Sequence, residues 1–338
     1  MNKMNFYLIK PYLQLIRPKN LLIIAFLQWT LQTWIITPIL IPYRLDISSS
    51  KVTFWFLVIA MILIAAGGYV INAYFDTRID AINRPDSIIV GEQVSKKTVM
   101  KYYIILTALG AIFGFGAALM VHSLSLTIIF FVLIGLLWFY SASYKRQFMI
   151  GNLIVASIAA IVPFSVGFLE VTSLSLRYGN LINMTPIPFK LYAWSGGFAL
   201  FAFLLTWIRE IIKDMEDEPG DRELECRTMP IKWGNKRTKL FLYSLIIGTL
   251  LLLYYFVTQI HFSNDFITMR YFLIGILMPF AYLFYQLIKA HITTDFHRAA
   301  STLKIIMLIG IFYSIIFYFL QATAYQFPFF GLLIVPAT

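Results

Sequence analysis

The stretch INAYFDTRIDAINRP (residues 71–85) follows a long apolar segment and carries three oxygen-bearing side chains at intervals of four residues. They are Asn72, Asp76 and Asp80. Because residues four apart share one face of a helix, the three side chains form a polar stripe about two turns long. The spacing therefore predicts a helix that runs out of an apolar span and presents this stripe on one side.

A second stretch, REIIKDMEDEPGD (residues 209–221), ends another apolar segment in the same way. Its acids fall at spacings of four, three and four, again on one helical face. They are Glu210, Asp214, Asp217 and Asp221. Pro219 and Gly220 are expected to end the helix, so that Asp221 approaches the others from a turn.

These two stretches hold most of the negative charge in the chain. Of 16 Asp and Glu residues, four lie within residues 76–92 and eight within residues 210–225. Neighbouring carboxylates repel one another, and the cost rises beside a membrane. Mg²⁺ is a hard cation that carboxylate oxygens bind and that is usually shared with phosphate. We therefore predict Mg²⁺ as the cofactor.

The alternative for each stretch is a solvated loop in which acidic and basic residues alternate for solubility. The C-terminal end of a helix prefers cations, so carboxylates at two such ends are locally unfavourable. Two stripes at matching positions therefore favour a functional interpretation. The four His residues are scattered without paired ligand spacing, which argues against a zinc-type site.

Composition indicates a membrane protein. Hydrophobic residues make up 60% of the 338 residues and charged residues 13%, against about 25% charged in a soluble domain. A membrane span needs about 20 mostly apolar residues. Nine segments qualify, at about 20–42, 52–74, 103–121, 123–141, 151–170, 191–212, 239–258, 270–289 and 302–321. The sequence predicts an all-α polytopic membrane protein whose residues 1–338 form a single domain.

The basic residues predict its orientation in the bilayer. With nine spans, 22 of the 27 Lys and Arg lie on the side of the N-terminus and of both acidic stretches, and five lie on the other. The positive-inside rule places the richer side in the cytoplasm. A bacterial or archaeal plasma membrane suits this pattern. The net charge of +11 fits anionic lipid better than nucleic acid, since the basic residues are dispersed over separate segments.

The acidic stretches also suggest an internal repeat. One follows the second span and the other follows the sixth, four spans later. Each is long and mixed in charge, and each is followed by short connections with little charge. We expect two four-helix pseudo-repeats plus a ninth helix, arranged so that both acidic stretches face one central cavity.

Basic and phenolic residues near the stripes suggest a phosphate ligand. Arg and Lys side chains bind phosphate oxygens that Mg²⁺ leaves free. The candidates that lie near the expected membrane boundary or interleave with the acids are Arg84, Lys145, Arg222 and Tyr140. The alternative for each basic residue is ordinary positive charge on the cytoplasmic side.

The segments N72AYFDTRIDAINRP85 and K213DMEDEPGDR222 resemble the two signature motifs of the UbiA superfamily of intramembrane prenyltransferases, N-x-x-x-D-x-x-x-D and D-x-x-x-D. The span count and the positions after spans two and six are similar too. Within the superfamily, REIIKDMEDEPGD is most like the branch of digeranylgeranylglyceryl phosphate synthase. The chain departs from the pattern at Ala73, where many members have Asp, and after Pro85.

The resemblance implies a function and a set of roles. Members have nine transmembrane helices around a central cavity and transfer a prenyl group from a prenyl diphosphate to a hydrophobic acceptor with Mg²⁺. The metal ligands implied are Asn72, Asp76, Asp80, Asp214, Asp217 and Asp221. The catalytic residues implied are Asp76, Asp80, Asp217 and Asp221, and the diphosphate ligands are Arg84, Lys145, Arg222 and Tyr140. A geranylgeranyl donor and geranylgeranylglyceryl phosphate as acceptor suit the branch.

The main alternative is a membrane transporter or binder of phosphorylated or isoprenoid lipids. Ionisable residues inside membranes also mark transport routes, but these normally lie near the midplane, at broken helices. The acids here gather at one face of the membrane and leave the span centres apolar, which favours the enzyme. A CDP-alcohol phosphotransferase would need a D-G-x-x-A-R pattern. The sequence leaves both a lipid and an aromatic compound as possible acceptors, and no obligatory protein partner is evident.

Overall fold

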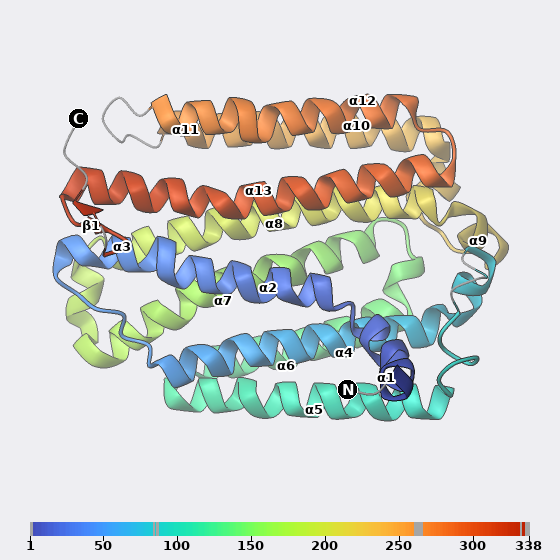
Figure 1. Cartoon of the computed structure of the whole chain (residues 1–338), viewed down its shortest axis with the longest axis horizontal. Helices are drawn as coiled ribbons and strands as arrows, with labels where there is room; N and C mark the ends of the chain where they lie inside the picture. Colours follow the sequence, from blue (N-terminus) through green and yellow to red (C-terminus); the bar gives the residue numbers. More distant parts are fainter. Residues whose placement is uncertain (1–2, 84, 86–87, 260–265, 332, 335–338) are drawn as a thin grey trace.

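The computed structural model describes residues 3–83, 85, 88–259, 266–331 and 333–334. Within these residues, nine helical segments are long and apolar enough to cross a membrane. Figure 1 shows them lying side by side along the long axis of the molecule. The prediction of an all-α polytopic membrane protein with nine transmembrane helices is confirmed.

The spans combine α-helices with short π or 3-10 segments. In chain order they are α2 (Pro18–Thr30) with η1 (Leu31–Ile36), α3 (Thr37–Leu40) and η2 (Ile41–Tyr43); α4 (Lys51–Asn83); α5 (Lys96–Met120); α6 (Leu124–Ala142); α7 (Ile150–Tyr178) with η5 (Gly179–Met184); α8 (Ile187–Glu216); α10 (Met229–Gln259); α11 (Phe266–Tyr271) with η6 (Phe272–Leu277) and α12 (Met278–Lys289); and α13 (Thr293–Tyr325). The shorter elements are α1 (Lys3–Ile16), η4 (Tyr144–Arg146), α9 (Glu218–Glu223) and the paired antiparallel strands β1 (Pro328–Phe329) and β2 (Leu333–Ile334).

Several helices continue beyond the segments that hydropathy predicts. The apolar pattern of the second span stops near residue 74, whereas α4 stays helical to Asn83. Likewise, α7 continues to Tyr178 although its apolar pattern stops near residue 170. The apolar pattern ends where polar side chains begin. The helix continues because its backbone N–H and C=O groups still have hydrogen-bond partners. The extension of α4 carries the polar stripe.

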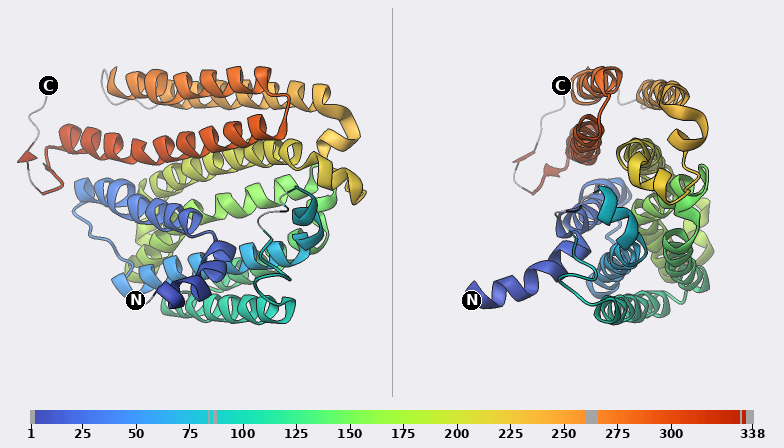
Figure 2. Two further views of the ribbon diagram at one scale, coloured as in Figure 1. Left: turned by 45° about the vertical axis from the view of Figure 1, so that its right-hand side comes forward. Right: turned by 90° about the vertical axis from the view of Figure 1, so that its right-hand side faces the viewer.

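The second and sixth spans end at the same side of the bundle. α4 and α8 both reach the region of α9, which contacts both of them (Figure 1). Viewed toward this end, α9 lies in front of the bundle, while α1 projects to one side (Figure 2). The two acidic stretches are therefore brought to one end of the protein, as the predicted pseudo-repeat requires.

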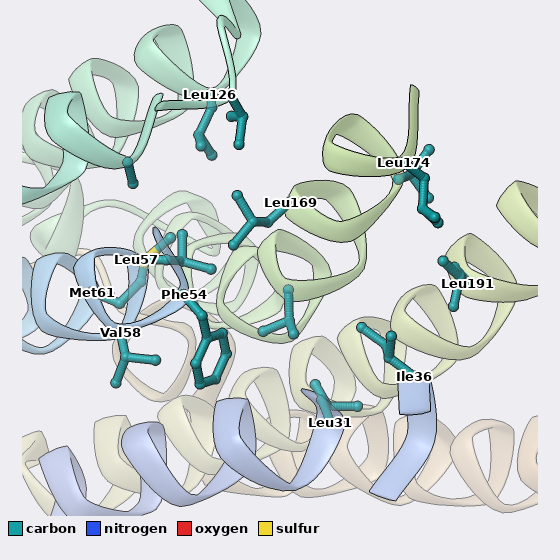
Figure 3. Packing of buried hydrophobic residues seen from close by; sticks show 14 of the residues in the cluster. Leu31, Ile36, Phe54, Leu57, Val58, Met61, Leu126, Leu169, Leu174 and Leu191 are labelled. Atoms are coloured by element: carbon teal, nitrogen blue, oxygen red, sulfur yellow. The ribbon is translucent and has the colours of Figure 1, made fainter. Parts of the chain in front are cut away.

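The largest hydrophobic core lies in the other half of the bundle. Figure 3 shows side chains from η1, the start of α4 and α6, the end of α7 and the start of α8 packing together. In lipid such contacts stabilise helix association mainly through close packing. The labelled members are Leu31, Ile36, Phe54, Leu57, Val58, Met61, Leu126, Leu169, Leu174 and Leu191. This core fixes the far halves of the helices and so positions their polar ends.

A buried carboxylate ties a loop to this core. Glu170 on α7 is 0% exposed and accepts hydrogen bonds from the backbone N–H of Ser48 (2.5 Å), the hydroxyl of Ser49 (2.6 Å) and the amide of Gln32 (3.4 Å). The backbone N–H of Ser49 also donates to it at 3.3 Å. Gln32 comes from the π-helical segment η1. Four donors replace the water that the carboxylate loses on burial.

We predict that Glu170→Ala lowers thermal stability. The substitution leaves several buried donors unsatisfied, which costs about 2–3 kcal/mol at such a site. Glu170→Gln keeps an acceptor oxygen and should be milder. Thermal unfolding in detergent measures the effect, with Glu92→Ala as a control because Glu92 is exposed. An unfolding temperature of Glu170→Ala equal to that of the control would contradict the structural role.

A cavity of about 740 Å³ lies in the same half as the largest core, between α8, α10, η6 and α13. It is lined mainly by apolar and aromatic side chains, with Tyr43 and Lys190 at one edge and Phe201 deeper along α8. The helix rise of 1.5 Å per residue puts Asp214 about 20 Å beyond Phe201. This apolar cavity is therefore remote from the acidic residues.

Candidate functional site

The polar stripe of α4 lies at the end of the helix, as predicted, and Asp76 is its most buried member at 5% exposed. Its Oδ2 atom accepts a hydrogen bond of 2.6 Å from Asn72 Nδ2. The same atom accepts a hydrogen bond from Lys145 Nζ and forms an ion pair with it. A cation and an amide thus offset the desolvation of this carboxylate.

Lys145 reaches Asp76 from the η4 turn between α6 and α7. The turn lies close to α7 because residue 151 is glycine: a Cβ there would come within 2.7 Å of Tyr144 O and 2.8 Å of Lys145 Cα. Burial acts to lower the pKa of the Lys145 ammonium, but the Asp76 carboxylate outweighs it and the pKa is raised. Lys145 therefore stays positively charged.

The second acidic stripe bends at the predicted helix break. α8 ends at Glu216, Asp217 lies at the junction, and Pro219 occupies the first turn of α9, where its missing N–H costs nothing. Asp221 is buried within α9, and its N–H donates to Asp217 O at 3.1 Å. The predicted helix break is confirmed, but Asp221 approaches from the short helix α9 rather than from a turn.

Asn83, the last residue of α4, joins the two stripes. Its Nδ2 donates to Asp217 O at 3.1 Å, and its Oδ1 accepts from the Gly220 N–H at 2.9 Å. Gly220 packs so closely that a Cβ would lie 2.7 Å from Asn83 Nδ2. These contacts hold the end of α4 against α9, so two stretches about 140 residues apart in sequence form one site.

Asp214 and Tyr140 extend the site toward the membrane interior. Asp214 Oδ2 accepts a hydrogen bond of 2.9 Å from Asn152 Nδ2, near the start of α7. Tyr140 on α6 is buried, and its hydroxyl lies within electrostatic range of Asp76 and Asp214. The site therefore draws side chains from five helices, α4, α6, α7, α8 and α9, and from the η4 turn.

The charged groups of the two stripes act on one another. Burial raises the pKa of Asp221 to about 6. The Lys145 ammonium opposes this change in the pKa of Asp221, whereas the carboxylates of Asp217 and Asp76 reinforce it. Negative charge exceeds positive charge in this cluster. A divalent cation would relieve the repulsion.

The oxygen donors fit Mg²⁺. Asn72 Oδ1 is buried with no hydrogen-bond partner among the described residues, so it is a free ligand oxygen beside Asp76. In the part of the chain that the structure describes, no three His, Cys, Asp or Glu side chains converge closely enough to hold a metal by themselves. Mg²⁺ usually binds one or two carboxylates together with substrate phosphates. The donor set therefore fits Mg²⁺ shared with phosphate.

One predicted diphosphate ligand, Arg222, lies away from the cluster. Arg222 is 63% exposed and pairs with Glu218 at 2.6 Å on the outer side of α9. Arg84 lies outside the described residues. Asp80 continues the α4 stripe one turn beyond Asp76 and is partly buried. Of the four basic and phenolic candidates, the structure brings Lys145 and Tyr140 to the acids.

Three residues that shape the site were not predicted from the sequence: Asn83, Gly151 and Asn152. An Asn close to the start of an apolar helix is costly in a membrane and signals a partner, so Asn152 was detectable in principle. A single Asn has no spacing pattern, however, and its partner on α8 is 62 residues away. Asn83 and Gly151 act through close approach between segments, for which the sequence contains no signal.

A model of the UbiA prenyltransferase family matches residues 33–299 of the chain. Among curated proteins, the digeranylgeranylglyceryl phosphate synthase of Sulfolobus acidocaldarius is 29% identical over 301 residues, which cover 88% of this chain and 94% of that protein. The synthase of Korarchaeum cryptofilum is 32% identical over 246 residues, covering 71% of this chain and 74% of that protein.

Solved structures share the fold. A digeranylgeranylglyceryl phosphate synthase structure superposes with a TM-score of 0.58 at 25% identity and covers 92% of this chain and 98% of its own. A UbiA homologue from Archaeoglobus fulgidus bound to DMAPP and Mg²⁺ has a TM-score of 0.52 at 16% identity, covering 88% of this chain and 98% of its own. Both matches extend over nearly the whole chain.

Proposed function

Because this chain belongs to the UbiA prenyltransferase family, we propose that its acidic end is the site of a Mg²⁺-dependent prenyl transfer. The donor is a prenyl diphosphate of the geranylgeranyl class, and the acceptor is a hydrophobic lipid, geranylgeranylglyceryl phosphate. The named relatives are synthases of digeranylgeranylglyceryl phosphate, a product that carries one more geranylgeranyl group than this acceptor. We propose that residues 1–338 act as one domain.

The observation that carries the proposal is the meeting of the two acidic stripes around Lys145. Asp76 pairs with Lys145, and the Asn83 contacts bring Asp217 and Asp221 to the same place. We assign the metal ligands to Asn72, Asp76, Asp80, Asp214, Asp217 and Asp221. Lys145 and Tyr140 contact the diphosphate from the helix ends opposite the acids.

The reaction needs charge neutralisation rather than a strong base. Mg²⁺, when bound, neutralises the diphosphate leaving group together with the Lys145 ammonium. The bond between C1 of the prenyl group and the diphosphate oxygen breaks, and its electron pair stays on the diphosphate. The acceptor hydroxyl oxygen bonds to C1, and its proton passes to solvent. The apolar helices that surround the prenyl chain keep water away from its allylic carbon, which water would otherwise capture, while the polar end of the site stays open to solvent.

We propose that the polar end of the bundle faces the cytoplasm of a bacterial or archaeal cell. The excess of Lys and Arg on this side supports that orientation under the positive-inside rule. Water-soluble diphosphate and Mg²⁺ then reach the acidic cluster directly, while the prenyl tail lies among the apolar helices.

Diphosphate release by the purified protein in detergent tests the proposal. Geranylgeranyl diphosphate is supplied with geranylgeranylglyceryl phosphate or with aromatic acceptors, each with and without Mg²⁺. We expect release that needs both Mg²⁺ and the lipid phosphate acceptor. Folded protein that releases no diphosphate with any acceptor would contradict the transferase and favour a lipid binder or transporter.

A further inference from the structure

A second cavity, of about 350 Å³, lies at the polar end between the start of α2, the end of α8 and the start of α13. Five basic side chains and one acidic side chain are among its lining residues. The basic ones are Arg17, Lys19, Arg209, Lys213 and Lys304, and the acid is Glu216. A protein with so few charged residues rarely places five cations around one small cavity, so an anion is the expected occupant.

Few of these cations are neutralised within the protein. Glu210 pairs with Arg209 at 2.6 Å and with Lys213 at 3.7 Å, so one carboxylate serves two cations. Lys304 makes no hydrogen bond or ion pair with any described residue, although it lies within electrostatic range of Arg209 and Arg17. Glu216 contacts His297 at 3.0 Å. Positive charge therefore remains in excess.

Two arginines at the cavity have unusual features: Arg209 has an unpaired buried N–H group, and Arg17 has a strained backbone. The Arg209 side chain is only 17% exposed, and its Nε–H is buried without a hydrogen-bond partner among the described residues. Arg17 takes a left-handed backbone conformation with φ of 52°, directly before Pro18. A non-glycine residue in this region is strained and is retained where the surroundings require it. The Arg17 guanidinium lies over the Tyr69 ring of α4, at 5.3 Å from its centroid.

The cavity lies beside the acidic cluster, on a different face of α8. At about 100° per residue, Arg209, Lys213 and Glu216 point about a quarter-turn away from the acidic face of the helix. The two faces adjoin at Glu210, which lies on the acidic face and pairs with Arg209 at 2.6 Å and with Lys213 at 3.7 Å. The acidic face includes Glu210 and Asp214, and Arg17 lies within electrostatic range of Glu210.

A basic cavity that adjoins the acidic cluster suits an acceptor that carries its own phosphate. In a glyceryl phosphate with its hydroxyl on the middle carbon, four covalent bonds of about 1.5 Å put that oxygen about 4–5 Å from the phosphorus. The oxygen must then come within about 3–3.5 Å of the reacting carbon. Two further bonds lead from that carbon to the diphosphate phosphorus. The phosphate of the acceptor thus lies about 9–10 Å from the diphosphate.

We propose that this cavity binds the phosphate monoester of the lipid acceptor, held by Arg17, Arg209 and Lys304, while the donor diphosphate occupies the acidic cluster. The volume admits about ten water-sized groups, enough for a glyceryl phosphate. This inference rests on the proposed function, because it assigns the acceptor of that reaction. It makes the acceptor phosphate a specificity determinant and Lys304 a substrate-binding residue.

The test compares acceptors with and without the phosphate. Transfer from geranylgeranyl diphosphate is measured for geranylgeranylglyceryl phosphate and geranylgeranylglycerol, in the wild type, Lys304→Gln and Arg17→Gln. Loss of one charge-assisted contact should raise KM for the phosphorylated acceptor about 10-fold or more. We expect KM for the donor and the rate with geranylgeranylglycerol to stay unchanged. Lys97→Gln, an exposed lysine at the start of α5, is the matched control.

A binding measurement without Mg²⁺ separates this inference from the reaction itself. Geranylgeranylglyceryl phosphate should raise the unfolding temperature of the wild type and of Lys97→Gln, but much less that of Lys304→Gln. If wild-type protein transfers nothing yet shows this pattern, the proposed function fails and the phosphate site stands. If transfer proceeds with equal KM in all variants, the phosphate site is wrong and the transferase stands.

The same measurement identifies the source of the phosphate. Inorganic phosphate and vesicles containing phosphatidylglycerol are tested in place of the acceptor. If either one gives the whole Lys304-dependent shift while acceptor KM is unaffected, the cavity is a general anion or membrane-lipid site and the assignment to the acceptor is overturned. A shift that requires the phosphorylated acceptor supports it.

Discussion

Asp76→Asn is expected to reduce Mg²⁺-dependent diphosphate release about 10²–10³-fold, the effect of removing one preorganised electrostatic contact to a developing charge. Asp76 is the most buried acid of the α4 stripe and has Asn72 and Lys145 as partners. The amide keeps the volume and can still bond to Lys145, but it removes the negative charge that attracts Mg²⁺. Steady-state release at saturating donor, with Mg²⁺ varied, measures the loss.

The control for this substitution is Asp46→Asn, which makes the same change at an exposed position before α4. It should leave release unchanged. Melting curves in detergent show whether Asp76→Asn is folded, because a buried Lys145 without its carboxylate costs stability. Folded Asp76→Asn protein with more than about a tenth of wild-type activity would contradict a direct role in metal binding, given the expected loss.

Lys145→Gln is expected to lower turnover about 10²-fold, since the ammonium acts on the diphosphate as charge develops there. Its pKa is raised above the ordinary value mainly because the Asp76 carboxylate outweighs the effect of burial, so it is charged throughout the working pH range. The effect should appear in the rate of diphosphate release more than in donor KM. Lys236→Gln, an exposed lysine on α10, is the matched control.

The double variant Asp76→Asn with Lys145→Gln gives an independent check. Each single change leaves its buried partner without a counter-charge, whereas the double change removes both charges together. The loss in the double variant should therefore be smaller than the product of the two single losses. Strictly multiplicative effects would mean that the two side chains act independently, against the contact seen in the structure.

Much of the fold follows from sequence because the membrane limits the choices. Backbone groups in lipid must be hydrogen-bonded internally, so long apolar runs form helices. The nine predicted spans each correspond to a helix of the bundle. The boundaries drawn from hydropathy alone were less accurate, as in α7, which extends to Tyr178 because polar residues end an apolar pattern without ending the helix. For α4, the spacing of the polar stripe predicted that the helix continues beyond the apolar span. α1 was missed altogether, since it is too short for a span.

The candidate site, like the fold, could be predicted from the sequence only in part. The spacing of Asn72, Asp76 and Asp80 predicted that they lie on one face of a helix. Pro219 predicted the helix break before Asp221. Spacing also suggested Arg222 as a ligand, but the turn of α9 directs it toward Glu218 and solvent. One residue along a helix rotates a side chain by about 100°, so a neighbour of a buried acid is often exposed. The spacing of residues in the sequence cannot show which of two adjacent side chains faces the protein interior after a helix break.

The helices, their number and the two acidic stripes can be predicted from the sequence, because they depend on hydropathy and on residues three or four apart along one chain segment. That the two stripes meet is a property of the folded protein. That meeting depends on Asn83 bonding to Asp217 and Gly220, on Gly151 admitting the Lys145 turn, and on α8 presenting basic and acidic faces to different neighbours. These are contacts between distant segments, and their energies depend on packing geometry that no single stretch of sequence contains.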